Sequence, residues 1–159
     1  MSEMSRPPDI EVSVPVRRAP RDAWLVVANP AAMAAFSPEL HSVTMSAEPP
    51  LPVGAQFAGT NRRGGRQWST SCRVVESAVD SSFAYDVTYI GRSVARWRYV
   101  VSEDDLGCRV TEQWWDRRGW LVRFVGEWGT GVHDRPTHNR QTMTATLERL
   151  RAALELDQR

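Results

Sequence analysis

Hydrophobic and other residues alternate near the start of the chain, where Ile10, Val12, Val14 and Val16 are separated by Glu, Ser and Pro. A period of two puts alternate side chains on one face of an extended strand, so this pattern is typical of a strand with one buried face. The proline favours a place near the edge or end of a sheet, because it cannot donate a backbone hydrogen bond. Residues 10–16 are therefore predicted to form a β-strand.

Two short helices are expected next, because each segment has a proline where a helix can begin. The first starts at Pro20, and Asp22 follows in the first turn, near the positive end of the helix dipole. The second starts at Pro30, after Asn29, which is a good N-cap. The sequence SPE at residues 37–39 is expected to end it.

From residue 41 to residue 116 the pattern keeps its period of two, with short turn signals between the runs. Gly64 and Gly65 form a two-residue hairpin signal, and Ile90 and Gly91 form another turn. Spacing this regular predicts an antiparallel meander. The six expected strands are residues 41–47, 57–63, 66–76, 83–89, 95–101 and 110–116.

The C-terminal part is predicted to be a long amphipathic helix. It should begin after Asp134, a suitable N-cap, with Pro136 just inside the first turn. Residues 119–131 before it are apolar and contain several glycines, and two interpretations remain open: a mobile gate over a cavity, or a lead-in to the helix. One face of the helix is expected to carry Asn139, Met143, Thr146, Leu147, Leu150 and Leu154.

This order of elements resembles the START-like, Bet v 1-like helix-grip fold of the SRPBCC superfamily, most of all its polyketide cyclase/dehydrase-like branch. The resemblance implies an α+β fold in which a curved antiparallel sheet of about seven strands wraps around the C-terminal helix and encloses a cavity. We expect one such domain at residues 9–156, after a flexible tail at residues 1–8. The resembling segments are VPVRRAPRDAWLVVANPAAMAAFSPEL, GTNRRGGRQWSTSCRVVE, VARWRYVV and THNRQTMTATLERLRA.

Composition and charge limit the classes of molecule that we expect the chain to bind. The 159 residues carry a formal net charge of +1, so the chain has no overall field to attract nucleic acid or an anionic membrane. Cys72 and Cys108 have a spacing that suits neither a zinc site nor a redox pair. No signal peptide and no membrane-spanning run is visible. We expect a cytoplasmic monomer or homodimer with reduced thiols, no cofactor, no metal, no nucleic-acid partner and no membrane insertion.

No strong catalytic motif is present: the sequence lacks H-E-x-x-H, G-x-S-x-G, a Walker loop and a dinucleotide fingerprint. The candidate chemistry is therefore that of a cavity wall, in which aromatic rings supply stacking surface and a few polar groups fix orientation. Parity along the strands and the helix gives the candidate ligand-binding residues: Phe57, Asn61, Arg63, Trp68, Thr70, Cys72, Tyr89, Trp97, Tyr99, Trp114, Asn139 and Met143.

Tyr85, Glu112 and Arg66 are the candidate catalytic residues. A carboxylate with the same parity as Val110 and Trp114 is costly to bury without a partner. Glu112 should therefore pair with an Arg or Tyr, lie at a solvated strand end, or have a pKa raised by burial, which would suit an acid or base.

The segment TNRRGGRQWSTSC places Arg63 opposite Arg66 across the Gly-Gly turn if the turn has two residues. Two facing arginines are unfavourable unless solvent or an anion relieves them. They are expected either to lie in water at the cavity mouth, which we favour, or to receive an acidic or enolate group there.

Two functions remain open at this point. The resemblance implies a polyketide cyclase, aromatase or dehydratase that positions a hydrophobic, polycyclic or polyketide-type molecule and acts on it by acid–base catalysis. The alternative is a protein that carries, sequesters or senses a hydrophobic metabolite without turnover.

Overall fold

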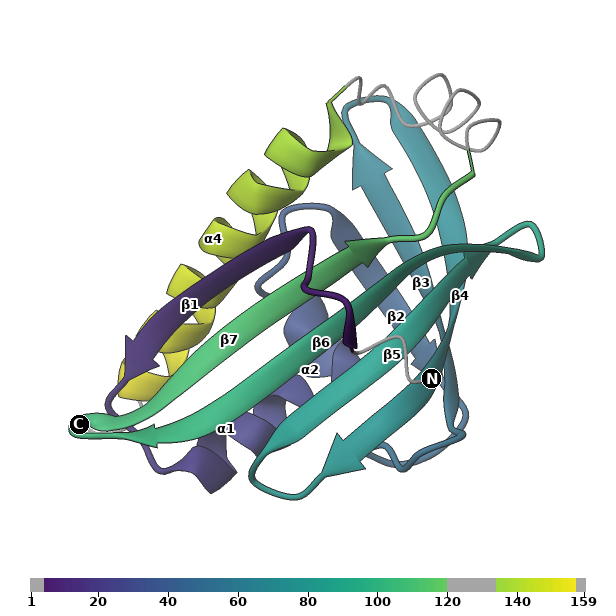
Figure 1. Ribbon diagram of the computed structural model, residues 1–159. Helices are drawn as coiled ribbons and strands as arrows, with labels where there is room; N and C mark the ends of the chain where they lie inside the picture. The colour runs from purple at the N-terminus through teal and green to yellow at the C-terminus, as the bar shows by residue number, and fades with distance from the viewer. Residues whose placement is uncertain (1–4, 120–133, 157–159) are drawn as a thin grey trace.

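The computed structural model describes residues 5–119 and 134–156, and these form one antiparallel sheet with helices on its concave side (Figure 1). The strands lie in the order β1-β7-β6-β5-β4-β3-β2. The predicted α+β helix-grip fold is confirmed. Its elements are β1 (Ile10–Val16), α1 (Pro20–Val27), α2 (Pro30–Ala34), β2 (Leu40–Met45), β3 (Gln56–Arg63), β4 (Arg66–Ala78), β5 (Ser82–Tyr89), β6 (Arg92–Asp104), β7 (Gly107–Asp116) and α4 (Arg135–Leu156).

The two short helices join the two edges of the sheet, because β1 and β2 are its outermost strands. The predicted starts are confirmed: both helices begin with proline, and the Asn29 side chain accepts a hydrogen bond from the Ala32 amide at the start of α2. Trp24 of α1 donates its indole N–H to the Ser82 carbonyl oxygen, at 2.9 Å. This bond ties α1 to the beginning of β5 and so helps to close one end of the curved sheet.

The hairpin around Gly64 has the predicted register. Phe57 pairs with Cys72, Gly59 with Thr70, Asn61 with Trp68 and Arg63 with Arg66. The positive φ of Gly64 (59°) is a conformation that glycine adopts easily. A two-residue turn therefore fixes which side chains of β3 and β4 point to the concave face.

Strands β6 and β7 extend beyond the predicted limits, to Asp104 and from Gly107. Their ends pair Asp104 with Gly107 and Glu103 with Cys108, so the hairpin continues where hydrophobic alternation has already stopped. Backbone pairing needs no apolar side chains, and for this reason the pattern underestimated the length of both strands.

The long helix α4 lies along the concave side of the sheet and buries the predicted face (Figure 1). Leu147 and Leu150 are fully buried. On the neighbouring β1, Val16 is also fully buried and Val14 exposes 4% of its area. This packing forms the core near the C-terminal half of α4. The N-terminal half instead borders the cavity, with Asn139 and Met143 on its wall. Residues 120–131, most of the segment considered as a gate, lie outside the described residues.

Candidate functional site

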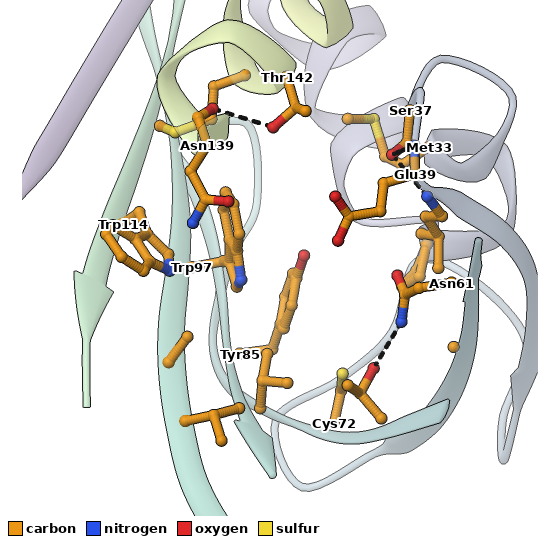
Figure 2. Close-up of a pocket in the computed structure, with 18 of the residues that line it drawn as sticks. Met33, Ser37, Glu39, Asn61, Cys72, Tyr85, Trp97, Trp114, Asn139 and Thr142 are labelled. Carbon is orange, nitrogen blue, oxygen red and sulfur yellow. Dashed lines mark hydrogen bonds between the residues drawn. The ribbon is translucent and has the colours of Figure 1, made fainter. Parts of the chain in front are cut away.

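A cavity of about 280 Å³ lies between the concave face of the sheet and α4, and the segment from α1 to β2 closes it on one side. Apolar and aromatic side chains form most of its wall, and a few polar groups interrupt them. Figure 2 shows side chains from the sheet, from α4 and from the α2–β2 region pointing into one common space. The predicted site residues on this lining are Phe57, Asn61, Trp68, Thr70, Cys72, Tyr85, Tyr89, Trp97, Tyr99, Glu112, Trp114, Asn139 and Met143.

Two aromatic contacts give the wall its shape. Phe57 meets Tyr85 edge to face, with ring centroids 4.9 Å apart and the planes at 74°. On the other side, the rings of Trp97 and Trp114 are tilted by 47° at 6.3 Å. Both pairs join neighbouring or nearby strands on the same face, so they hold the curvature and present flat apolar surface to a ligand.

Glu112 is the most unusual group in this wall. It lies in the middle of β7, faces the concave side opposite Tyr99, and exposes only 3% of its area. The Tyr99 hydroxyl donates to Oε1 at 2.9 Å, whereas Oε2 has no hydrogen-bond partner among the described residues. Burial raises the pKa of Glu112 to about 8, and the Tyr99 hydrogen bond lowers it only in part. Glu112 therefore holds its proton at neutral pH.

Tyr85 and Tyr99 lie beside this carboxyl group and share its environment. Burial raises the pKa of both phenols well above the ordinary value of 10.0, and the nearby Glu112 raises both further. A hydrogen-bonding contact with Tyr99 acts in the opposite direction on Tyr85. All three groups are therefore proton donors at neutral pH, and the Tyr85 hydroxyl points into the cavity (Figure 2).

The wall also contains two amide side chains and a thiol, those of Asn139, Asn61 and Cys72. Asn139 is 5% exposed, and its amide points into the cavity from α4. Asn61 donates to the Thr70 hydroxyl oxygen at 3.4 Å, across the β3–β4 pair. Burial raises the pKa of the Cys72 thiol to about 12, so this cysteine is a small apolar group and not a thiolate nucleophile at neutral pH.

A second carboxylate, Glu39, reaches the cavity from the other side. Its Oε1 accepts from the Arg135 guanidinium at 3.1 Å, and its Oε2 lies 2.5 Å from Nε2 of His138. Arg135 also lies over the Trp68 ring, with 5.9 Å from its central carbon to the ring centroid. These contacts join the start of α4 to the residue before β2, and the Glu39 carboxylate points into the cavity (Figure 2).

Sequence reasoning missed this group. Glu39 lies in a connection without periodicity, where the sequence SPE predicts only the end of a helix. Its partners Arg135 and His138 are three residues apart at the start of α4, so they fall on one side of that helix. The spacing of Arg135 and His138 is the one signal of this group in the sequence. It does not show that their partner is Glu39, almost a hundred residues earlier in the chain.

Arg63 and Arg66 face each other across the turn as predicted, but both are exposed and neither is part of the cavity lining. The turn lies at the far end of the β3–β4 hairpin, so concave parity does not bring its side chains to the cavity. Arg118 and Arg135 line the cavity instead. Burial lowers the pKa of Arg135, and the charges of Arg118 and Arg63 lower it further, against the effect of Glu39.

This arrangement, a curved sheet that holds a C-terminal helix over an apolar cavity, defines a ligand-binding protein of the helix-grip class. The family described as polyketide cyclase/dehydrase and lipid transport matches residues 7–155. The chain belongs to this family. No curated protein matches it.

Three solved structures illustrate the likeness. The di-domain aromatase/cyclase StfQ of the steffimycin biosynthetic pathway is 15% identical with a TM-score of 0.69, over 93% of this chain and 50% of that one. This chain thus spans half the length of that di-domain protein. CV1439 from Chromobacterium violaceum is 14% identical with a TM-score of 0.68, over 92% of this chain and 96% of the other. The polyketide cyclase-like protein Cgl2372 from Corynebacterium glutamicum is 20% identical with a TM-score of 0.62, over 93% and 91%. Identities this low show the shared fold alone.

Within residues 5–119 and 134–156, no helix has the length and apolar character needed to cross a membrane. In the same residues, no three His, Cys, Asp or Glu side chains come together as metal ligands would.

Proposed function

We propose that the cavity binds a hydrophobic, polycyclic or polyketide-type molecule and that Glu112 acts on it as a general acid. The observation that carries this proposal is the Glu112 carboxyl group, buried in the cavity wall with Oε1 bonded to Tyr99 and Oε2 without a partner within residues 5–119 and 134–156. An unpartnered polar atom in a buried wall costs free energy unless a ligand supplies the missing bond.

The chemistry follows from the proton that Glu112 retains. Because Oε1 accepts from Tyr99, the carboxylic proton is available on Oε2, where it can be donated to a ligand oxygen. A hydrogen bond to a ketone draws electrons from the carbonyl and makes the neighbouring C–H more acidic. The same acid can protonate a hydroxyl group as it leaves as water, and the Glu112 carboxylate left behind can take up the proton of the neighbouring C–H, which balances the loss of water.

Tyr85 and the aromatic wall supply the positioning. The Tyr85 hydroxyl points into the same space, and it can orient a second ligand oxygen without ionising, since its pKa is raised. Trp97 and Trp114 offer flat surface on which fused rings can stack. A cavity of about 280 Å³ lies near the lower end of ligand-site volumes, which favours a compact molecule of a few rings.

A non-catalytic carrier is the second candidate, and one observation favours it. The hydroxyl groups of Tyr85 and Tyr99 and the carboxyl group of Glu112 all hold their protons at neutral pH, so none of the three is a base. In a carrier, Glu112 would serve only to recognise a carbonyl oxygen.

The two candidates differ in their response to Glu112→Gln. The amide retains a donor of nearly the same shape but has no proton to transfer. In an enzyme, this variant and Tyr85→Phe lose the dehydrated or cyclised product while ligand affinity stays within about tenfold. Product would be followed by mass spectrometry after co-expression with a minimal polyketide synthase, and Glu148→Gln, on the exposed face of α4, is the control. Unchanged product in Glu112→Gln would overturn the catalytic role.

Native mass spectrometry of protein from its own host would identify a carried ligand.

A further inference from the structure

The cavity has a carboxyl group on each of two opposite sides, and the two groups differ in their surroundings. Glu112 is on β7, and Glu39 directly precedes β2, with four strands of the sheet between β7 and β2. Both side chains nevertheless line the same cavity. Figure 2 shows Glu39 on one side and Trp114, the inward neighbour of Glu112 on β7, on the other.

The partners of Glu39 keep it as a hydrogen-bond acceptor. Its Oε1 forms an ion pair with Arg135 at 3.1 Å, and its Oε2 lies 2.5 Å from Nε2 of His138. A carboxylate offers about four acceptor positions, so these two partners leave positions free toward the cavity. Glu112 is the opposite case, because Tyr99 donates to its Oε1 and its Oε2 has no hydrogen-bond partner among the residues that the structure describes.

We propose that the cavity has two hydrogen-bonding ends of opposite polarity and therefore selects a fused-ring ketone with a phenolic or enolic hydroxyl at its far end. The hydroxyl donates to Glu39, and the ketone oxygen accepts from Glu112. This assignment rests on the proposed function and adds to it the polarity of the ligand and a second residue that determines specificity.

Charge balance argues against the other ligands that a carboxylate can hold. Arg135 already neutralises Glu39, so a cationic ligand would add an unbalanced positive charge to a largely apolar cavity. A carboxylate on the ligand would in turn lie against Glu39. A neutral O–H donor satisfies the free acceptor positions and leaves the contacts of Glu39 with Arg135 and His138 intact.

The test uses three matched bicyclic probes. 6-Hydroxy-1-tetralone carries a phenol at one end and a ketone at the other, 6-methoxy-1-tetralone lacks the donor, and 5,6,7,8-tetrahydro-2-naphthol lacks the ketone. Binding is measured by calorimetry at about pH 6.5, below the pKa of the phenol and of Glu112. The wild-type protein should bind the hydroxy-ketone about tenfold or more tightly than either matched probe, because the methoxy probe loses a hydrogen bond to the charged Glu39 and the naphthol leaves the buried carboxyl group of Glu112 without an acceptor.

Variants assign the two ends. Glu39→Gln should abolish the preference for the hydroxy over the methoxy probe and leave the methoxy affinity within about twofold. Glu112→Leu should abolish the preference for the ketone over the naphthol. Glu148→Gln, an exposed carboxylate of α4, should change neither preference.

The outcomes separate this inference from the proposed function. Equal binding of the three probes to the wild-type protein overturns the two-ended recognition and leaves a hydrophobic ligand site, and this comparison needs no variant to fold. An equal loss for the hydroxy and methoxy probes in Glu39→Gln also overturns it, because Glu39 would then only hold α4. If no probe binds at all, the ligand class of the proposed function fails as well.

Discussion

Replacing Glu112 by glutamine retains the size of the buried side chain and an oxygen for Tyr99, but it removes the group that titrates. The pKa of Glu112 is raised from the ordinary value of 4.5 to about 8. Between these values the folded protein holds a proton that the unfolded chain has released. Stability therefore falls as pH rises through this window, because the unfolded state then binds fewer protons than the folded state.

The size of the effect follows from the two pKa values. Each pKa unit corresponds to 1.36 kcal/mol. Raising the pKa from 4.5 to about 8 therefore removes about 4 kcal/mol from the free energy of unfolding between about pH 5 and about pH 9. The burial of Glu112, with 3% of its area exposed, leaves little solvent to screen this cost. Glu112→Gln should not lose this contribution, so it should be about 4 kcal/mol more stable relative to wild type at the higher pH than at the lower.

Urea unfolding followed by tryptophan fluorescence measures this difference directly. Wild type and Glu112→Gln are compared at about pH 5 and about pH 9, so that contributions from all other titrating groups cancel. Glu148→Gln, with an exposed carboxylate, should follow wild type at both values. A difference between wild type and Glu112→Gln that does not change with pH would refute the argument, because Glu112 would then titrate alike in both states.

The remaining predictions concern a turn and the thiols. Gly107→Ala should destabilise the protein by about 2 kcal/mol or more in the same assay, because φ is 145° and a Cβ atom would lie 2.6 Å from the Arg18 carbonyl oxygen. Gly65→Ala, which has open space, should stay within about 0.5 kcal/mol, and similar losses in the two variants would contradict this reasoning. Cys72 and Cys108 should react with an aromatic disulfide reagent at least about a hundredfold more slowly in native protein than in urea, because burial raises the pKa of both thiols; a rapid native burst would contradict it.

Much of the cavity wall was predictable from the sequence because strand faces are local. A period of two assigns each side chain to one face, and the Gly64-Gly65 turn then sets the register, so the inward positions of β3 and β4 follow together. The same parity brought Tyr85, Tyr99 and Glu112 to one face across three strands. In the same way, the helical period predicted that Asn139 and Met143 lie on one face of α4.

The sequence by itself therefore determined the order of the elements and which side chains share a face, and its resemblance to a known family implied the helix-grip arrangement. Only the tertiary structure decided how far the cavity extends and what each polar group meets. It left Arg63 and Arg66 at the exposed end of a hairpin, and it brought Glu39 to Arg135, almost a hundred residues away. It also decided that Glu112 is both paired with Tyr99 and fully buried. The physical reason is that parity depends on neighbouring residues, whereas burial and charge partners depend on the curvature of the whole sheet around α4.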